Sequence, residues 1–167
     1  PIKSSAASDV YKRQDKTLSF GLLNDVEQWT LLDPVYKAYT KDLCGYAERG
    51  EKEWKRLLGS FFAEGVNIAV VKNDEGQIEG YAVYRLGAPE IPVTEFVYTT
   101  RRAQRGLLNY FYNHRSQGES IRWNEGLHDT GYRFVPDGKT GHTTMPYMMA
   151  RIVDVCLLYT SDAADDL

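Results

Sequence analysis

Two runs of strand-forming residues joined by a short turn constrain the fold of this chain most. Residues 67–72 (NIAVVK) and 77–86 (QIEGYAVYRL) are rich in β-branched and aromatic side chains, which favour half-buried strands. Residues 73–76 (NDEG) lie between the two runs, and Asn, Asp and Gly in that position are typical of a hairpin turn. The sequence therefore predicts an antiparallel hairpin around which the other elements are arranged.

A short strand and two helices are predicted before the hairpin. Apolar residues alternate with others over residues 18–22, which indicates a strand. The pair Asp33-Pro34 supplies an N-cap and a first helical residue for one helix, and Gly45 is expected to close it. The second helix has a single apolar stripe that must pack on another element. The stripe consists of Trp54, Leu57, Leu58, Phe61 and Phe62.

The elements expected after the hairpin complete an α/β pattern. In order they are a loop at 88–92, a strand at 93–98, a helix capped by Thr100, a strand from Ser120, a polar loop or insertion at 126–142, and a strand at 144–155. This order predicts an α/β domain with a mixed, mostly antiparallel sheet flanked by helices.

The two ends of the chain are interpreted as translated sequencing adapter. Codons for residues 4–14 (SSAASDVYKRQ) can be chosen so that their reverse complement, read one base further in, encodes residues 156–165 and then Asp or Glu. Two unrelated protein tails are not expected to have that relation. Residues 1–14, which are predicted to be disordered, and residues 156–167 are therefore interpreted as artefacts outside the fold. The remainder is interpreted as a truncated fragment whose neighbouring domains are missing.

Composition excludes several classes of function. The net charge of −3 argues against a general binder of nucleic acid or of anionic membranes. No apolar run has the length of a membrane span and no secretory signal is visible, so a cytoplasmic protein is expected. Outside the ends the one cysteine is Cys44, and the three histidines show no metal-ligand spacing. We therefore predict no disulfide and no metal site.

Four strings resemble one protein family in their order and spacing. They are the segment 36–58 with its tyrosines, Arg49 and Trp54; EGYAVYRL at 79–86; TEFVYTT at 94–100 followed by LLNYFYNHRSQ; and YMMARIVDV at 147–155. Together they resemble the central domain of the Eis ("enhanced intracellular survival") family of GNAT N-acetyltransferases.

That resemblance implies a protein of three parts. An N-terminal GNAT domain binds acetyl-CoA and acetylates an amine, a second domain has the GNAT-like fold without the cofactor site, and the third resembles sterol carrier proteins. Residues 15–143 would be the second part, and 144–155 would lead into the missing third. The resemblance also implies a hexamer and a small amine substrate, such as an aminoglycoside, a polyamine or a lysine side chain. The catalytic groups would lie in the missing parts, so no catalytic residue is assigned and the fragment is predicted to be inactive.

The cofactor site can be tested on the residues themselves. A working GNAT domain holds the pyrophosphate of acetyl-CoA on backbone N–H groups in a Q/R-x-x-G-x-G/A loop, where glycines keep side chains away from the phosphates. The corresponding stretch, residues 99–108 (TTRRAQRGLL), fails this pattern in every register. Its glycine, Gly106, has Ala103 three residues before it and Leu108 two residues after it. We predict that this domain does not bind acetyl-CoA in the usual way.

Arg101, Arg102 and Arg105 lie in the first turns of the same predicted helix. Cations there oppose the helix dipole, so an anion nearby would account for them. One interpretation is a solvated basic face or pairing with acids such as Glu95 or Glu119. The other is a relic phosphate site or a contact to a neighbouring domain. Nucleic acid is disfavoured because no aromatic residues interleave with the arginines.

Trp54 also has two interpretations. Its place at the head of an apolar stripe indicates core packing, whereas the resemblance implies that an aromatic side chain of this domain walls part of the amine cavity. Two alternatives to the whole assignment stay open: a stand-alone GNAT enzyme with a degenerate acetyl-CoA loop, and a non-catalytic binding or assembly module.

Overall fold

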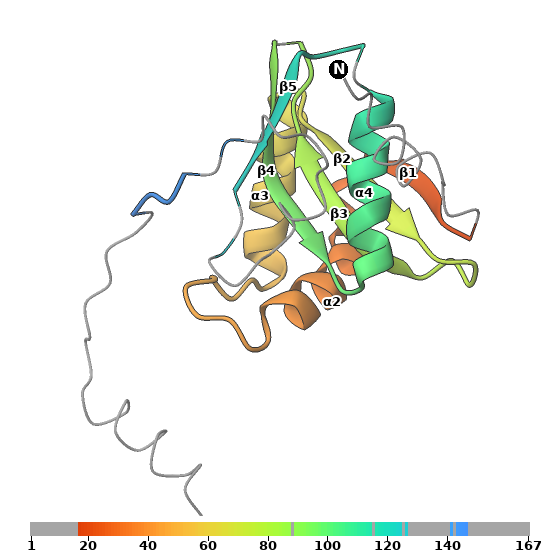
Figure 1. The fold of residues 1–167 in the computed structure, drawn as a ribbon. Coiled ribbons are helices and arrows are strands. Elements are labelled where there is room, and N and C mark those ends of the chain that lie inside the picture. Colours follow the sequence, from red (N-terminus) through yellow and green to blue (C-terminus); the bar gives the residue numbers. More distant parts are fainter. Residues whose placement is uncertain are drawn as a thin grey trace, which may run out of the picture. The chain divides into compact units, whose positions relative to one another are not determined.

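A computed structural model describes residues 17–87, 89–114, 116–124, 126, 141 and 143–146. The chain divides into two units, Pro1–Pro136 and Asp137–Leu167. The described elements all belong to the first unit (Figure 1). They are β1 (Ser19–Leu23), the 3₁₀ turn η1 (Val26–Gln28), α2 (Trp29–Thr40), α3 (Glu51–Ala63), β2 (Asn67–Lys72), β3 (Ile78–Tyr84), β4 (Glu90–Tyr98), α4 (Arg101–Asn113) and β5 (Ser120–Trp123).

The described strands form one sheet in the order β1-β2-β3-β4-β5. The first three pairings are antiparallel and the pairing of β4 with β5 is parallel. This confirms the predicted mixed, mostly antiparallel sheet. A parallel pair needs a crossover, and α4 supplies it. The expected hairpin is β2 and β3, and its turn contains Gly76 at φ +79°, a conformation that favours glycine.

The strand β4 carries a bulge. Val83 of β3 lies opposite Glu95, whereas the next residue, Tyr84, lies opposite Val93. Thr94 is therefore the extra residue. The parallel partner β5 pairs only with the first part of β4, from Glu90 to Val93.

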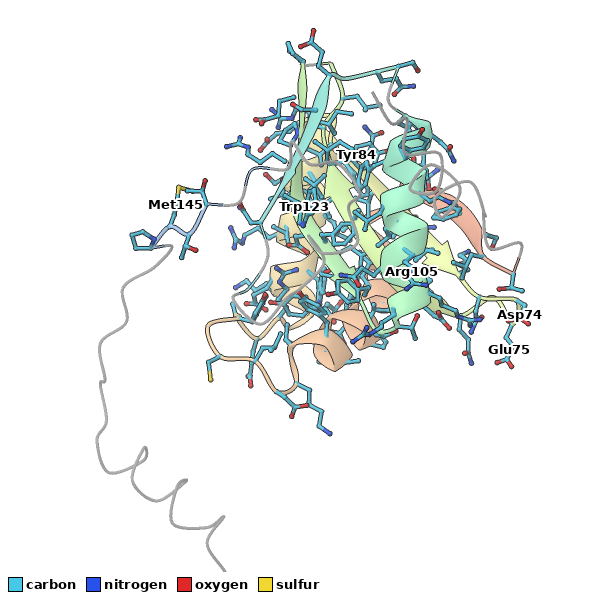
Figure 2. The ribbon with its side chains drawn as sticks, in the orientation of Figure 1. Asp74, Glu75, Tyr84, Arg105, Trp123 and Met145 are labelled. Atoms are coloured by element: carbon cyan, nitrogen blue, oxygen red, sulfur yellow. The ribbon has the colours of Figure 1, made fainter. Side chains whose placement is uncertain are left out.

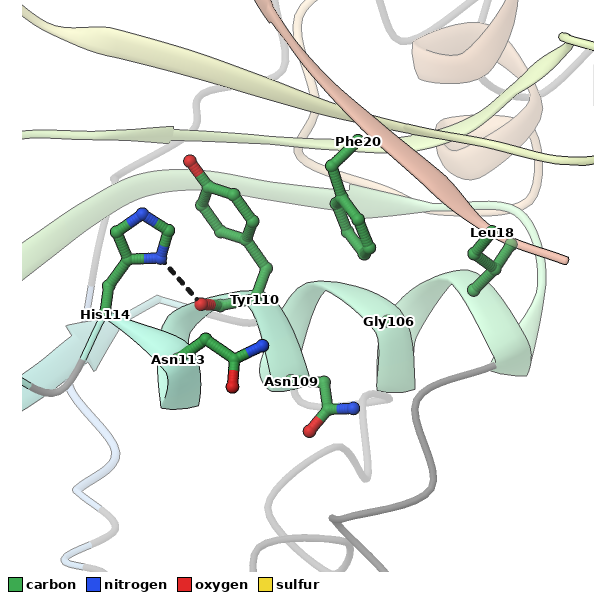
Figure 3. A pocket seen from close by; sticks show the side chains of 7 residues that line it. All are labelled: Leu18, Phe20, Gly106, Asn109, Tyr110, Asn113 and His114. Carbon is green, nitrogen blue, oxygen red and sulfur yellow. Dashed lines mark hydrogen bonds between the residues drawn. The ribbon is translucent and has the colours of Figure 1, made fainter. Parts of the chain in front are cut away.

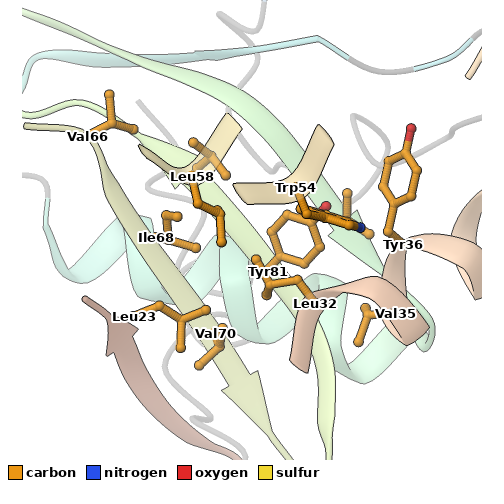
Figure 4. Close-up of a cluster of buried hydrophobic side chains, with 12 residues drawn as sticks. Leu23, Leu32, Val35, Tyr36, Trp54, Leu58, Val66, Ile68, Val70 and Tyr81 are labelled. Carbon is orange, nitrogen blue, oxygen red and sulfur yellow. The ribbon is translucent and has the colours of Figure 1, made fainter. Parts of the chain in front are cut away.

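Two apolar cores lie on the two faces of the sheet, with α2 and α3 on one face and α4 on the other (Figure 1). Successive residues of β2 alternate between these cores: Ile68 and Val70 face α2 and α3, whereas Ala69 and Val71 face α4. All four are buried, as expected for a strand that is covered on both faces. The first core is shown in Figure 4.

The predicted start of the first helix was wrong. Asp33 and Pro34 lie inside α2, which begins at Trp29. The actual cap is Asp25, whose side chain accepts the N–H of Glu27 (3.0 Å), while the side chain of Gln28 accepts the N–H of Asp25 (3.1 Å). This capping box starts η1, which leads directly into α2. Pro34 costs the helix one hydrogen bond, and its neighbours Leu32, Val35 and Tyr36 are buried.

Two other boundaries also differ from those predicted. The helix α2 ends at Thr40 rather than near Gly45, which has φ +89° in the following loop. The loop predicted at 88–92 is shorter, because β4 begins at Glu90 and includes Pro92. The carbonyl oxygen of Pro92 accepts the N–H of Arg85 (3.2 Å), just past the end of β3 and next to the bulge at Thr94, and bulges are among the places where a strand tolerates proline. The ends of the chain and most of the strand predicted at 144–155 lie outside the described residues.

Candidate functional site

A carboxylate from β3 lies at the start of α4. Glu79 accepts hydrogen bonds from the Arg102 guanidinium (2.6 and 2.9 Å) and from the Thr100 hydroxyl (2.8 Å). The Asn73 amide lies 3.4 Å from the same carboxylate. Thr100 is also the N-cap of α4, since its side chain accepts the N–H of Ala103. The first turn of α4, where the helix dipole attracts negative charge, is thus supplied with an anion from within the chain.

The sheet register puts Glu79 at this position. Gly80 of β3 pairs with Tyr98, the last residue of β4, so Glu79 lies beside the residues that lead into α4. Thr99 donates both its N–H (2.8 Å) and its hydroxyl (3.0 Å) to the carbonyl oxygen of Glu79. Hydrogen bonding to Arg102 lowers the pKa of the Glu79 carboxyl below its ordinary value, against the opposing effect of burial. Glu79 is therefore a carboxylate at neutral pH.

Gly106 serves packing between α4 and the sheet. A Cβ at this position would lie 2.9 Å from Leu18 Cδ1, 3.4 Å from Phe20 Cζ and 3.5 Å from Val71 Cγ2. The missing side chain thus lets α4 approach β1 and β2 closely. Gly106 is the one glycine of residues 99–108, and it lies in a helix and faces the sheet, not a phosphate loop.

The three arginines predicted as a possible anion contact differ in position. Arg102 pairs with Glu79, so pairing with an acid is confirmed for this residue, but the acid is not one of the two expected. Arg101 and Arg105 are exposed on α4, and Figure 2 shows Arg105 there. Glu95 pairs with a different arginine, Arg49, because it points to the opposite face of the sheet from α4.

A second charged cluster lies on that opposite face. The guanidinium of Arg49 donates two hydrogen bonds to the Glu95 carboxylate, at 2.8 and 3.1 Å. The Tyr81 hydroxyl donates a third, at 2.8 Å. Only 17% of the Arg49 side chain and 13% of the Glu95 side chain are exposed. Charge-assisted bonds in such surroundings are among the stronger polar interactions in a protein.

Two aromatic rings cover the same guanidinium. Arg49 Cζ lies 4.0 Å from the centroid of the Tyr36 ring and 4.7 Å from that of the Trp54 ring. Burial raises the pKa of Tyr81 well above its ordinary value, and the neighbouring Glu95 adds to that effect. The phenol of Tyr81 is therefore protonated at neutral pH and can donate to Glu95.

Trp54 is buried in the first core, with 1% of its surface exposed. Its indole N–H donates to Asp33 Oδ1 at 2.9 Å, and Figure 4 shows the ring with Tyr36 on one side and Tyr81 on the other. Within this unit Trp54 is therefore a core residue, as its place in the apolar stripe indicated. Since the ring also covers Arg49, it has a polar role that the apolar stripe did not reveal.

A pocket of about 120 Å³ lies between β1 and α4 (Figure 3). Leu18, Phe20 and Tyr110 supply apolar lining, and Asn109, Asn113 and His114 supply polar lining. The His114 ring nitrogen Nδ1 bonds the carbonyl oxygen of Tyr110 at 2.8 Å, which occupies one nitrogen of the imidazole. Nearby, the hydroxyls of Tyr84 and Tyr110 lie 2.7 Å apart, and burial raises the pKa of Tyr84. These groups are arranged for packing, and none is paired as a nucleophile with a base.

The described part of the chain has neither a cluster of metal-binding side chains nor a helix that could span a membrane. It contains no group of three or more His, Cys, Asp or Glu side chains that could hold a metal ion. None of its helices combines the length and the apolar character needed to cross a membrane. Cys44 is a free, exposed thiol.

Sequence reasoning missed Arg49 and Glu79 as site residues and named Glu95 only as a partner of other arginines. One signal was available: Glu95 stands inside the apolar run VTEFVY, and a charge in a buried strand needs a partner. The identity of that partner was not readable, because Arg49 is far away in sequence.

Comparisons with known proteins agree with this architecture. Residues 45–152 match the model of a family described as "Acetyltransferase (GNAT) domain", whereas no curated protein matches. Among solved structures, a probable N-acyltransferase from Enterococcus faecalis V583 is similar with a TM-score of 0.58 and 21% identity, over 70% of this chain and 30% of the Enterococcus chain.

Two shorter proteins are similar over nearly their whole length. A ribosomal-protein-alanine N-acetyltransferase from Brucella melitensis biovar Abortus 2308 has a TM-score of 0.56 and 12% identity, over 80% of this chain and 99% of its own. An aminoglycoside acetyltransferase from an uncultured soil metagenomic sample has a TM-score of 0.56 and 15% identity, over 82% and 99%. At these identities the likeness concerns the fold.

Proposed function

The chain belongs to the GNAT acetyltransferase family, and we propose that it is part of an N-acetyltransferase in which this domain supports the reaction without holding acetyl-CoA itself. The GNAT fold predicted from the sequence is confirmed by the family match and by the solved structures. Acetyl transfer from acetyl-CoA to an amine is the activity that the family suggests for the whole protein.

The observation that carries the proposal is the position of Glu79. GNAT domains bind the pyrophosphate of acetyl-CoA at the start of the helix that here is α4, with backbone N–H groups as donors. In this chain a carboxylate lies there and is held by Arg102 and Thr100. A pyrophosphate would have to displace that carboxylate or lie against it, and like charges in contact repel each other.

The lack of glycines at the start of α4 also argues against a pyrophosphate site. No glycine occurs between Tyr98 and Gly106, so the turn that enters α4 has side chains at every position. Gly106 faces β1 and β2 and is part of the packing between helix and sheet. The residues present therefore do not fit an acetyl-CoA pyrophosphate, and no step of acetyl transfer is assigned to them.

The finer assignment is to an Eis-like protein, of which residues 15–143 would be the second domain. The strings that resemble that family support it, and so does the similarity to a segment that is 30% of a longer Enterococcus chain. In such a protein an N-terminal GNAT domain would bind acetyl-CoA, and a sterol-carrier-like domain would follow residue 155. The substrate would be a small amine, such as an aminoglycoside, a polyamine or a lysine side chain, and the protein would be a cytoplasmic hexamer.

Titration of the chain with acetyl-CoA by isothermal calorimetry tests the central point. We expect no binding at concentrations up to about 1 mM, which corresponds to a binding free energy weaker than about −4 kcal/mol, and no acetylation of an amine. The same titration of Glu79→Gln tests whether the Glu79 charge repels a phosphate, because this variant lacks that charge. Glu75→Gln is the control, since it changes the net charge equally at an exposed acid of the β2–β3 turn. Micromolar binding by the wild-type chain that Arg102→Ala abolishes would refute the proposal.

A stand-alone enzyme is the second candidate. The chain spans 99% of the Brucella acetyltransferase and of the metagenomic aminoglycoside acetyltransferase, so a domain of this size does not require further domains. That candidate predicts acetyl-CoA binding by the wild-type chain that depends on Arg102 or Arg105. A non-catalytic assembly module, the third possibility, predicts no transferase domain in the protein that contains this chain.

A further inference from the structure

The side chains around Arg49 have the composition of a cation-binding site. Glu95 supplies two carboxylate oxygens to the guanidinium, and the rings of Tyr36 and Trp54 lie 4.0 and 4.7 Å from its central carbon. Carboxylate and aromatic faces are the two groups that proteins use to bind organic cations. In this chain the cation is a side chain of the protein itself.

The geometry selects a guanidinium over an ammonium ion. Both terminal nitrogens of Arg49 bond Glu95, one to each oxygen, which is the paired arrangement that a planar guanidinium forms and a point charge does not. The Tyr81 hydroxyl donates to Glu95 Oε2 and so fixes the carboxylate before any cation binds. Trp54 is oriented by its own hydrogen bond to Asp33.

The walls of the site belong to rigid elements and its occupant belongs to a loop. Tyr36 lies on α2, Trp54 on α3, and Glu95 on β4. Arg49 lies between α2 and α3, in a segment of mostly exposed residues from 41 to 50 that contains neither helix nor strand. Loss of the Arg49 side chain therefore removes the occupant without removing any wall.

We propose that Tyr36, Trp54 and Glu95 form a guanidinium-binding site, which Arg49 fills from within the chain and which a small alkylguanidinium ion fills when that side chain is removed. The site does not depend on the proposed acetyltransferase function, because it is built on the face of the sheet opposite α4. A guanidinium group presented by a small ligand would compete with Arg49, and its binding would release the Arg49 side chain from Glu95.

The test is rescue of Arg49→Ala by methylguanidinium. The urea unfolding of this variant is measured with increasing methylguanidinium chloride, in the range of about 1–20 mM, where the ion is far below the molar concentrations at which it denatures. When the ion reaches about ten times its dissociation constant, the unfolding equilibrium constant is expected to fall about elevenfold. Methylammonium chloride and sodium chloride at equal concentration are expected to have a much smaller effect.

Two control variants separate a built site from a general effect of the ion. The double variant Arg49→Ala/Glu95→Gln lacks the carboxylate and is expected to lose the rescue. Arg85→Ala, which removes an arginine from an exposed pair with Glu64, is expected to show none. If methylguanidinium and methylammonium stabilise Arg49→Ala equally, or if the double variant responds as strongly, the site does not exist as proposed.

If Arg49→Ala does not fold alone, the same titration is read as the fraction of folded protein recovered on dilution from urea. Recovery with methylguanidinium but not with methylammonium supports the site. No recovery with either ion, while Arg85→Ala refolds normally, overturns it, because the vacated space would then have collapsed.

Discussion

Replacement of Glu95 by glutamine is the most informative single perturbation of this domain. The change keeps the shape of the side chain and removes its charge. Arg49 then remains with 17% of its side chain exposed and faces an amide whose single oxygen accepts a hydrogen bond, whereas its NH2 group only donates. The Tyr81 hydroxyl can still donate to that oxygen, so the main loss is confined to the ion pair.

The expected loss follows from burial. Removal of one partner from a buried ion pair costs about 3–5 kcal/mol, because the other charge is left without compensation. Here the guanidinium keeps its contacts with Tyr36 and Trp54, and a cation over an aromatic ring gains about 0.5–2 kcal/mol. We therefore expect the free energy of unfolding to fall by about 3 kcal/mol, toward the lower end of the range for buried pairs.

Urea unfolding followed by tryptophan fluorescence measures this change. With an m-value of about 2 kcal/mol/M, the midpoint is expected to fall by about 1.5 M. Glu64→Gln is the matched control, because the pair Arg85–Glu64 is shorter, at 2.6 Å, but 50% and 56% of its side chains are exposed. Exposed pairs contribute about 0–1 kcal/mol. Equal losses in the two variants would show that burial does not set the strength of these pairs and would refute the reasoning.

Three further predictions concern the start of α4 and the glycines. Hydrogen bonding to Arg102 lowers the pKa of Glu79. The stabilisation by ionised Glu79 is therefore present above the unfolded-state pKa of 4.5, and it is lost as the pH falls through the folded-state pKa. Glu79→Gln is therefore expected to lower the urea midpoint at pH 7 and to flatten its fall below pH 4.5, and parallel curves for variant and wild type would contradict this. Thr100→Ala is expected to cost about 1 kcal/mol by removal of the N-cap, with Thr100→Ser close to wild type in the same assay. Gly80→Ala would place a Cβ 2.8 Å from a backbone oxygen of β4 and is expected to lower the free energy of unfolding by at least about 2 kcal/mol. Gly59→Ala has open space in α3 and is expected to raise the free energy of unfolding by up to about 1 kcal/mol. Thermal unfolding distinguishes the two.

Local patterns predicted the elements whose signals lie in adjacent residues. The hairpin, the stripe headed by Trp54 and the cap at Thr100 were each readable because the interacting groups are a few residues apart. The start of α2 was not, because two signals competed. Asp33-Pro34 has the composition of a helix start, but Asp33 instead accepts the indole N–H of Trp54 and the Lys37 ammonium. A tertiary contact thus determined the role of a residue that local rules assign to a cap.

The two charged clusters show why the site itself was harder to predict. Arg49 and Glu95 are separated by 46 residues, and Glu79 and Arg102 by 23. Which acid meets which arginine depends on strand register and on the face to which each side chain points. The bulge at Thr94 affects both the register and the face, since a β-bulge changes the alternation of side chains along a strand. No spacing rule contains that information.

The two clusters also bear on where chemistry takes place. Glu79 supplies the start of α4 with an anion, and Glu95 supplies Arg49 with a carboxylate, so in each cluster a charge that could attract a ligand is already neutralised within the chain. An anion at the start of α4 would have to displace Glu79 or lie against it, and a guanidinium at Glu95 would have to displace Arg49. A tethered group competes at a high effective concentration. This supports the proposal that the domain assists an active site outside it. It also makes the two proposals separable: acetyl-CoA binding gained by Glu79→Gln would concern only the α4 side of the sheet, and methylguanidinium rescue of Arg49→Ala would concern only the other.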